Sequence, residues 1–109
     1  MFKITNNYIY HTRGDTASFN VGVCLDGQPI PYNTYTGTFS VKRALDDVGY
    51  VLQTSVVNGR IDLTPEMTKN LPIGEYWYDI ELHVTEDSGD EIVETIGPYH
   101  YRLMADITR

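Results

Sequence analysis

The stretch from Gly59 to Val84 constrains the fold more than any other part of the chain. Thr64 is well suited to precede a helix, because its hydroxyl can accept a free backbone N–H, and Pro65 suits the first helical position, where no donor is needed. The segment 71–74, Leu-Pro-Ile-Gly, predicts the end of the helix. From Glu75 the apolar residues recur with period two, which indicates a long strand with one buried face. The inward face is predicted to be Tyr76, Tyr78, Ile80, Leu82 and Val84, and the outward face Glu75, Trp77, Asp79, Glu81, His83 and Thr85.

A short alternating segment, Arg60 to Leu63, precedes the helical turn, so the unit reads strand, helical corner, strand. A glycine two residues before a tyrosine opens the second strand, and such a unit resembles the E–F corner of immunoglobulin-like sandwiches. The resemblance makes Tyr76 the corner tyrosine, with one buried hydroxyl hydrogen bond. We therefore predict a structural corner made of Thr64, Pro65, Gly74 and Tyr76.

Short alternating segments make up the rest of the chain, with turns at the intervals of about eight to twelve residues that are typical of an antiparallel sandwich. Strands are predicted at 2–10, 16–25, 35–43, 50–57, 60–63, 75–85, 92–96 and 99–104. We therefore predict a single domain, residues 1–109, with an all-β fold. Its architecture is expected to be an immunoglobulin-like antiparallel β-sandwich of seven or eight strands with one short helical corner.

Three local predictions depend on the register of single strands. One face of the first strand is predicted to carry Phe2, Ile4, Tyr8 and Tyr10. In the segment 50–57 two inward sets compete, and they are Tyr50, Leu52 and Val56, or Val51 and Val57. Gly97-Pro98 predicts a bulge or a sheet edge, since proline cannot donate to a central ladder.

The charge of the chain narrows the range of partners. Its 109 residues carry a formal net charge of −7, which argues against nucleic acid and anionic membrane, because Lys and Arg dominate those contacts. No run approaches the ~20 apolar residues of a membrane span, and the first residues lack the apolar core of a signal peptide. We therefore expect a protein made in the cytoplasm, with neither nucleic acid nor membrane as a partner.

Residues that could hold a metal or perform catalysis lack the spacing that this chemistry needs. The acidic loop 86–91 is too short for a calcium loop. His11, His83 and His100 follow no zinc-ligand spacing, and no serine or cysteine lies in a nucleophile motif. The tripeptide Arg13-Gly14-Asp15 is more typical of a turn than of receptor binding. We therefore expect no cofactor, no metal and no enzymatic activity.

Trp77 is the most suggestive single residue for binding. It falls on the outward face of the best-defined strand, where a tryptophan can anchor a protein interface or stack on a sugar ring, unless a neighbouring element covers it. The segment from Tyr99 to Met104 carries only Arg102 as a strand charge, and it is predicted to be a poorly protected sheet edge. The candidate contact surface therefore consists of Trp77, Tyr99, Tyr101 and Arg102.

Motifs along almost the whole chain resemble one known group of proteins. They are Arg-Gly-Asp-Thr at 13–16, Asp-Gly-Gln-Pro-Ile at 26–30, Thr-Phe-Ser-Val-Lys at 38–42, Leu-Thr-Pro-Glu at 63–66, Gly-Glu-Tyr-Trp-Tyr-Asp-Ile at 74–80 and Ala-Asp-Ile-Thr-Arg at 105–109. The chain resembles the small immunoglobulin-like structural proteins of tailed bacteriophages, and it is similar to the N-terminal domain of phage upper baseplate proteins. The resemblance implies a component of a phage or prophage virion, in the tail, baseplate or capsid, that is made in the cytoplasm of the bacterial host. Its expected partners are other virion proteins or copies of itself, and the resemblance carries over no catalytic residues.

Two other functions stay open at this point. One is a carbohydrate-binding module that uses Trp77 and surface tyrosines. The other is a stand-alone bacterial interaction domain of the same fold. Neighbouring genes would separate these functions, because tail or head genes favour a virion component and polysaccharide-degradation genes favour a carbohydrate-binding module.

Overall fold

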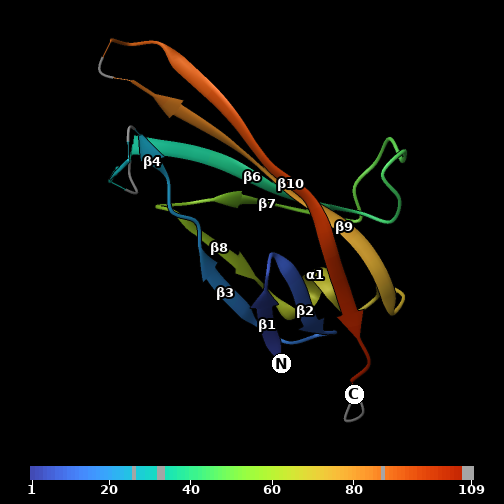
Figure 1. Cartoon of the computed structure of the whole chain (residues 1–109). Helices are drawn as coiled ribbons and strands as arrows, with labels where there is room; N and C mark the ends of the chain where they lie inside the picture. The colour runs from blue at the N-terminus through green and yellow to red at the C-terminus, as the bar shows by residue number, and fades with distance from the viewer. Residues whose placement is uncertain (26, 32–33, 87, 107–109) are drawn as a thin grey trace.

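Two β-sheets of unequal size pack around a common core (Figure 1). The computed structural model describes residues 1–25, 27–31, 34–86 and 88–106. The larger sheet has the strand order β1-β2-β10-β9-β6-β7, the smaller sheet pairs β3 with β8, and a short hairpin pairs β4 with β5. The elements are β1 (Phe2–Thr5), β2 (Tyr8–Thr12), β3 (Ala17–Asn20), β4 (Cys24–Leu25), β5 (Gln28–Pro29), β6 (Tyr35–Lys42), β7 (Leu52–Val56), β8 (Arg60–Leu63), α1 (Pro65–Thr68), β9 (Gly74–Thr85) and β10 (Glu91–Met104).

The predicted all-β sandwich is confirmed, and two details differ from the prediction. The described residues contain ten strands rather than the predicted seven or eight. The predicted strand 2–10 is a hairpin, the predicted strand 16–25 is divided into β3 and β4, β5 was not predicted, and the predicted strands 92–96 and 99–104 form the single strand β10. Every described strand pair is antiparallel except β2 with β10, which run parallel with Ile9 opposite Tyr101. A parallel pair cannot be closed by a tight turn, so no local motif in the sequence could have indicated it.

The first hairpin corrects the predicted phase of the N-terminal strand. Asn6 and Asn7 have φ values of 50° and 66°, a left-handed conformation that asparagine tolerates better than most residues. They form the turn between β1 and β2, so the alternation restarts after them. As a result, Ile9 and His11 are fully buried, and Tyr8 and Tyr10 are only partly covered.

The helical corner lies where it was predicted, between β8 of the small sheet and β9 of the large sheet. The Tyr76 hydroxyl donates to the Pro72 carbonyl oxygen at 2.5 Å, which is the bond expected of a corner tyrosine. Gly74 opens β9 with φ 144°, a conformation that favours glycine. Thr64 has the extended backbone of a helix-capping residue, with φ −96° and ψ 158°, but its side chain makes no capping hydrogen bond. The corner is therefore stabilised by the hydrogen bond from Tyr76 to the Pro72 carbonyl rather than by a capping bond from Thr64.

We expect Tyr76→Phe to lower the free energy of unfolding by about 1 kcal/mol, since the Pro72 carbonyl loses a buried hydroxyl partner while the ring stays in place. Chemical denaturation of the purified variant measures this change. Tyr50→Phe is a matched control, because Tyr50 is 54% exposed. An unchanged denaturation midpoint for Tyr76→Phe would show that the Tyr76 hydroxyl does not stabilise the corner.

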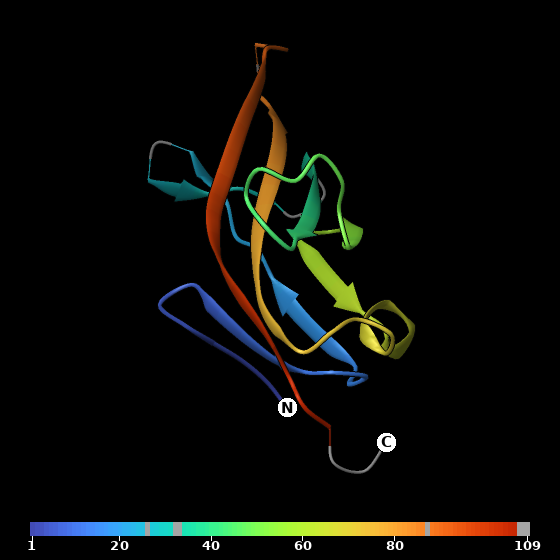
Figure 2. The same ribbon diagram turned by 90° about the vertical axis from the view of Figure 1, so that its right-hand side faces the viewer.

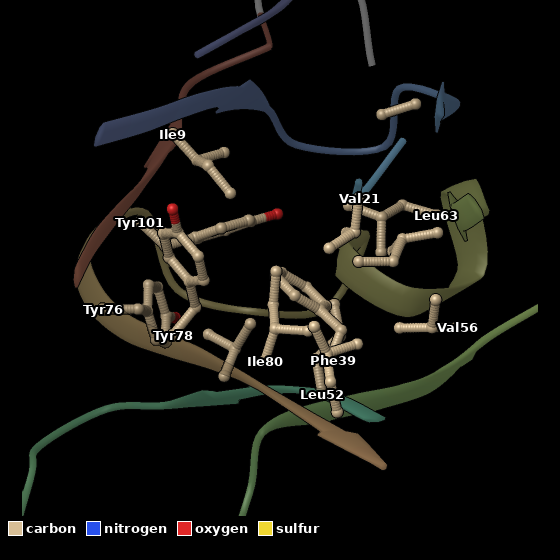
Figure 3. Packing of buried hydrophobic residues seen from close by; sticks show 14 of the residues in the cluster. Ile9, Val21, Phe39, Leu52, Val56, Leu63, Tyr76, Tyr78, Ile80 and Tyr101 are labelled. Atoms are coloured by element: carbon tan, nitrogen blue, oxygen red, sulfur yellow. The ribbon is translucent and has the colours of Figure 1, made fainter. Parts of the chain in front are cut away.

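Aromatic rings of the large sheet meet at the centre of the core (Figure 3). The Phe39 ring on β6 lies 5.7 Å from Phe19 of the small sheet, 5.5 Å from Tyr78 and 6.4 Å from Tyr101, measured between ring centroids. The predicted inward face of β9 is buried along its whole length. Figure 3 also shows Leu52 and Val56 in the core, so the first of the two predicted inward sets for this strand is confirmed for these residues. Its third member was wrong, because Tyr50 precedes β7 and is 54% exposed.

A histidine and a tyrosine form a buried polar pair at the parallel junction of β2 and β10. His11 is fully buried, its Nε2 lies 2.8 Å from the Asp15 carbonyl oxygen, and its Nδ1 lies 2.5 Å from the Tyr101 hydroxyl. A carbonyl oxygen only accepts, so Nε2 carries the proton and Nδ1 accepts from the Tyr101 hydroxyl. Burial lowers the pKa of His11, and the bond to the Asp15 carbonyl opposes this effect. His11 is therefore neutral in the folded protein at neutral pH.

Acidification from about pH 7.5 to about pH 5.5 is expected to destabilise a His83→Gln variant more than the wild type. The folded state lowers the pKa of His11 from its usual value of 6.5. Its contribution to the free energy of unfolding is therefore complete above pH 6.5 and is lost as the pH falls from 6.5 through the lowered pKa. His83 has the opposite sign, since hydrogen bonds to Glu91 and Glu81 raise its pKa. The contribution of His83 to stability is present below pH 6.5 and disappears as the pH rises through the raised pKa of His83. Urea denaturation at both pH values measures the difference, and equal losses in the two proteins would contradict the raised pKa of His83.

Candidate contact surface

Four aromatic rings form a continuous run across the outer face of the large sheet. The centroid of the Trp77 ring on β9 lies 4.1 Å from His100 on β10, and His100 lies 5.1 Å from Tyr8 on β2. Tyr8 in turn stacks on Tyr10 at 4.6 Å. We call Trp77, His100, Tyr8 and Tyr10 the aromatic strip. Trp77 is partly buried, so it is neither isolated on the surface nor hidden by another element.

Glu75 fixes the polar side of the aromatic strip. Its carboxylate accepts from the Tyr8 hydroxyl at 2.5 Å and from the Arg102 guanidinium at 2.6 Å, so it ties β2, β9 and β10 together. Burial opposes ionisation of Glu75, but these two hydrogen bonds outweigh it and hold the pKa of the carboxyl below its usual range. Glu75 and Arg102 pair directly across the strands, and Glu75 also holds the Tyr8 hydroxyl, so the position of the Tyr8 ring is restricted before any partner binds.

The structure brings together only two of the four predicted contact residues. Trp77 and Arg102 share the outer face with the aromatic strip. Tyr101 was predicted wrongly, because it lies opposite Tyr76 on the inward face and is 1% exposed. Tyr99 lies opposite Tyr78 on the same inward side, at the margin of the core, and is 37% exposed. Neither tyrosine therefore belongs to the surface around Trp77.

The predicted free edge of β10 also needs correction. Residues from Tyr101 to Met104 pair with β2, so this segment lies inside the sheet. The preceding part, from Glu91 to His100, pairs only with β9 within the described residues. Its register shifts between Ile96 and Tyr99, so the bulge predicted at Gly97-Pro98 is confirmed. Figures 1 and 2 show this end of the β9–β10 hairpin extending beyond the small sheet. The free edge is therefore Glu91–His100.

A small hollow lies beside Trp77, between the large sheet and the loop that joins β6 to β7. Its volume is 180 Å³, and its lining includes Ser40, Lys42, Tyr50, Trp77, Asp79 and Pro98. We call it the Trp77 hollow. The Lys42 ammonium lies 5.4 Å from the centre of the Tyr50 ring and donates to the Asp47 carbonyl at 2.7 Å. Burial raises the pKa of Asp79, nearby Glu81 adds to this shift, and Lys42 opposes it. The hollow was not predicted, because the sequence does not indicate that Lys42 pairs with Trp77.

The other residues considered for chemistry have structural roles in the described part of the chain. Arg13 pairs with Asp106 at 3.0 Å, and the Gly14 N–H donates to the buried Thr68 hydroxyl at 2.8 Å, in the turn that was predicted there. His83 bridges two glutamates on the outer face. Among the described residues no group of three or more metal-ligand side chains gathers. The acidic loop 86–91 lies partly outside the described residues.

Among the described residues, no helix is long and apolar enough to cross a membrane. No protein-family model matches the chain, and no curated protein is similar enough to it to count as a relative. The function is therefore argued from the aromatic strip, the free edge and the Trp77 hollow.

Proposed function

We propose that this chain is a non-enzymatic structural module of a phage or prophage virion, an immunoglobulin-like domain that attaches to tail, baseplate or capsid proteins through protein–protein contacts. The observation that carries the proposal is the aromatic strip. Tyrosine and tryptophan are enriched in protein interfaces, and clustered aromatic anchors contribute most of the binding energy there. The motifs that resemble phage structural proteins support the virion as the setting.

Preorganisation favours the aromatic strip as a binding surface. Its rings are already stacked, and Tyr8 is fixed by its bond to Glu75. A partner that lands on these rings therefore has few side chains to immobilise, which reduces the entropic cost of association. Arg102 and Glu75 lie beside the rings and supply a polar rim.

The free edge of β10 offers a second mode of contact on the same strand. From Glu91 to His100 one side of the strand has no strand partner among the described residues, and an extended segment of another protein can add to such an edge. Glu94 lies on the core-side face of this segment and is exposed. A charge in that position discourages indiscriminate edge-to-edge pairing. The formal net charge of the chain, −7, favours a partner with a basic contact surface.

Sedimentation velocity of the purified protein, alone and mixed with tail, baseplate or capsid proteins encoded beside it, tests the proposal. We expect Trp77→Ala to weaken binding by about 2 kcal/mol, roughly 30-fold, because Trp77 ends the strip at the middle of the sheet. Val48→Ser is the control, since Val48 is fully exposed and lies in the β6–β7 loop. If folded Trp77→Ala binds every partner as the wild type does, the strip is not the contact surface.

Carbohydrate binding is the second candidate function, and the Trp77 hollow favours it. Trp77 and Tyr50 both line the hollow, with Asp79 between strands β6 and β10. Aromatic rings beside hydrogen-bonding groups are the combination that a sugar requires, because a sugar has both C–H faces and hydroxyls.

A further inference from the structure

We propose that the Trp77 hollow binds one neutral sugar ring. The inference gives the second candidate function a definite site and ligand class, and it does not depend on protein binding by the aromatic strip. The hollow, at 180 Å³, is smaller than the about 300–1,000 Å³ of sites for drug-sized ligands. It therefore has room for a single ring rather than for an oligosaccharide or a folded peptide segment.

Aromatic side chains from two different parts of the chain line the hollow. Trp77 comes from β9 in the large sheet, and Tyr50 comes from the end of the β6–β7 loop. His100 packs against Trp77 from β10, at 4.1 Å between ring centroids, and helps to hold the indole in place. Pro98, at the bulge in β10, adds a rigid apolar surface. These groups offer the packing that the C–H faces of a sugar ring need.

Hydrogen-bonding groups of both kinds also line the hollow. Asp79 is partly buried, and its carboxylate makes no hydrogen bond or ion pair within the part of the chain that the structure describes. Its acceptor oxygens are therefore free for ligand hydroxyls. The Lys42 ammonium has three donors, and the structure assigns one of them to the Asp47 carbonyl. A ligand with several hydroxyls can donate to Asp79 and accept from Lys42.

The local charges select against other ligand classes. An apolar ligand would cover Asp79 and Lys42 without giving them partners, which costs free energy. An anion would meet the Asp79 carboxylate within a chain of net charge −7. A cation beside Asp79 would be repelled by the positive charge of Lys42, which already interacts with the Asp79 carboxylate. A neutral polyhydroxylated ring satisfies the aromatic and polar groups together.

The experiment uses the only tryptophan of the chain as its reporter. The indole N–H of Trp77 gives a single NMR signal, which is followed while the methyl glycosides of glucose, galactose, mannose and N-acetylglucosamine are added to the full chain. We expect a saturable shift of this signal with at least one glycoside, in the millimolar range. The glucuronide matched to glucose is expected to bind more weakly than the glucoside, because its carboxylate faces Asp79.

Two variants test whether the ligand occupies the hollow. Asp79→Asn and Tyr50→Ala both change exposed or partly exposed side chains, and each is expected to reduce the affinity at least several-fold. Tyr10→Ala is the matched control, since Tyr10 lies at the far end of the aromatic strip. The proposal is overturned if no glycoside gives a saturable shift, or if Asp79→Asn and Tyr50→Ala bind as tightly as Tyr10→Ala. Sedimentation of Asp79→Asn with virion partners separates this result from the protein contacts, which this variant should keep.

Discussion

Replacing Tyr101 with alanine is expected to lower the free energy of unfolding by about 3–5 kcal/mol. The side chain is 1% exposed, and its ring packs against Phe39 and Tyr76. Its hydroxyl is also the donor to His11, so truncation leaves a buried ring nitrogen without a partner. The loss is large because a cavity opens at the centre of the sandwich and an unsatisfied polar atom is created beside it.

Urea denaturation of Tyr101→Ala, compared with the wild type, measures this loss. Arg102→Ala is the matched control. Arg102 follows Tyr101 in β10, lies on the outer face and makes an exposed ion pair with Glu75. We expect the control to lose far less stability than Tyr101→Ala, because an exposed ion pair contributes little. A larger loss in Arg102→Ala than in Tyr101→Ala would reverse the assigned faces of β10.

Gly97→Ala is expected to cost about 1–3 kcal/mol from backbone strain alone. Gly97 has φ 107°, and a Cβ there would meet the Tyr78 carbonyl oxygen at 2.8 Å and the Asp79 Cα at 3.3 Å. Both contacts are with backbone, so a change of rotamer cannot relieve them. The bulge that Gly97 permits also sets the position of Pro98 in the Trp77 hollow, so the substitution should weaken sugar binding as well.

Two glycines provide matched controls for Gly97→Ala. Gly22 has open space around it and no positive φ, so Gly22→Ala should be neutral or slightly stabilising. Gly89 has φ 89° but nothing within 4 Å, so Gly89→Ala measures strain without a close contact. Denaturation midpoints of the three variants rank them, and a Gly97→Ala loss no greater than that of Gly22→Ala would contradict the assigned bulge geometry.

The sequence was most informative where local signals agreed. Thr64-Pro65, Gly74 and the alternation after Glu75 all predicted the corner and the long strand, and the structure has both. These features depend on residues that are neighbours along the chain, so pattern and turn chemistry were sufficient. The same reasoning failed for β2, because two asparagines in the left-handed region reset the alternation within an apparently continuous strand.

The candidate surface was harder to predict, because it depends on contacts between distant strands. The bulge at Gly97-Pro98 changes which residues of β10 face inward, from Ile96 opposite Ile80 to Tyr99 opposite Tyr78. Tyrosine suits both a half-buried face and a core with hydroxyl partners, so residue type did not reveal that Tyr101 is internal. The aromatic strip joins β2, β10 and β9, and only their pairing places Tyr8, His100 and Trp77 side by side.

The parallel pairing of β2 with the end of β10 has a mechanical consequence. Tension applied at the N-terminal end of β2 and at the C-terminal end of β10 acts along the two parallel strands, so it shears one strand against the other. The hydrogen bonds of this ladder then carry the load together. In the antiparallel hairpin β1–β2, a pull on β1 can separate the bonds one after another. Under such tension we expect β1 to detach first, while the parallel ladder between β2 and β10 and the His11–Tyr101 hydrogen bond resist sliding of the two strands.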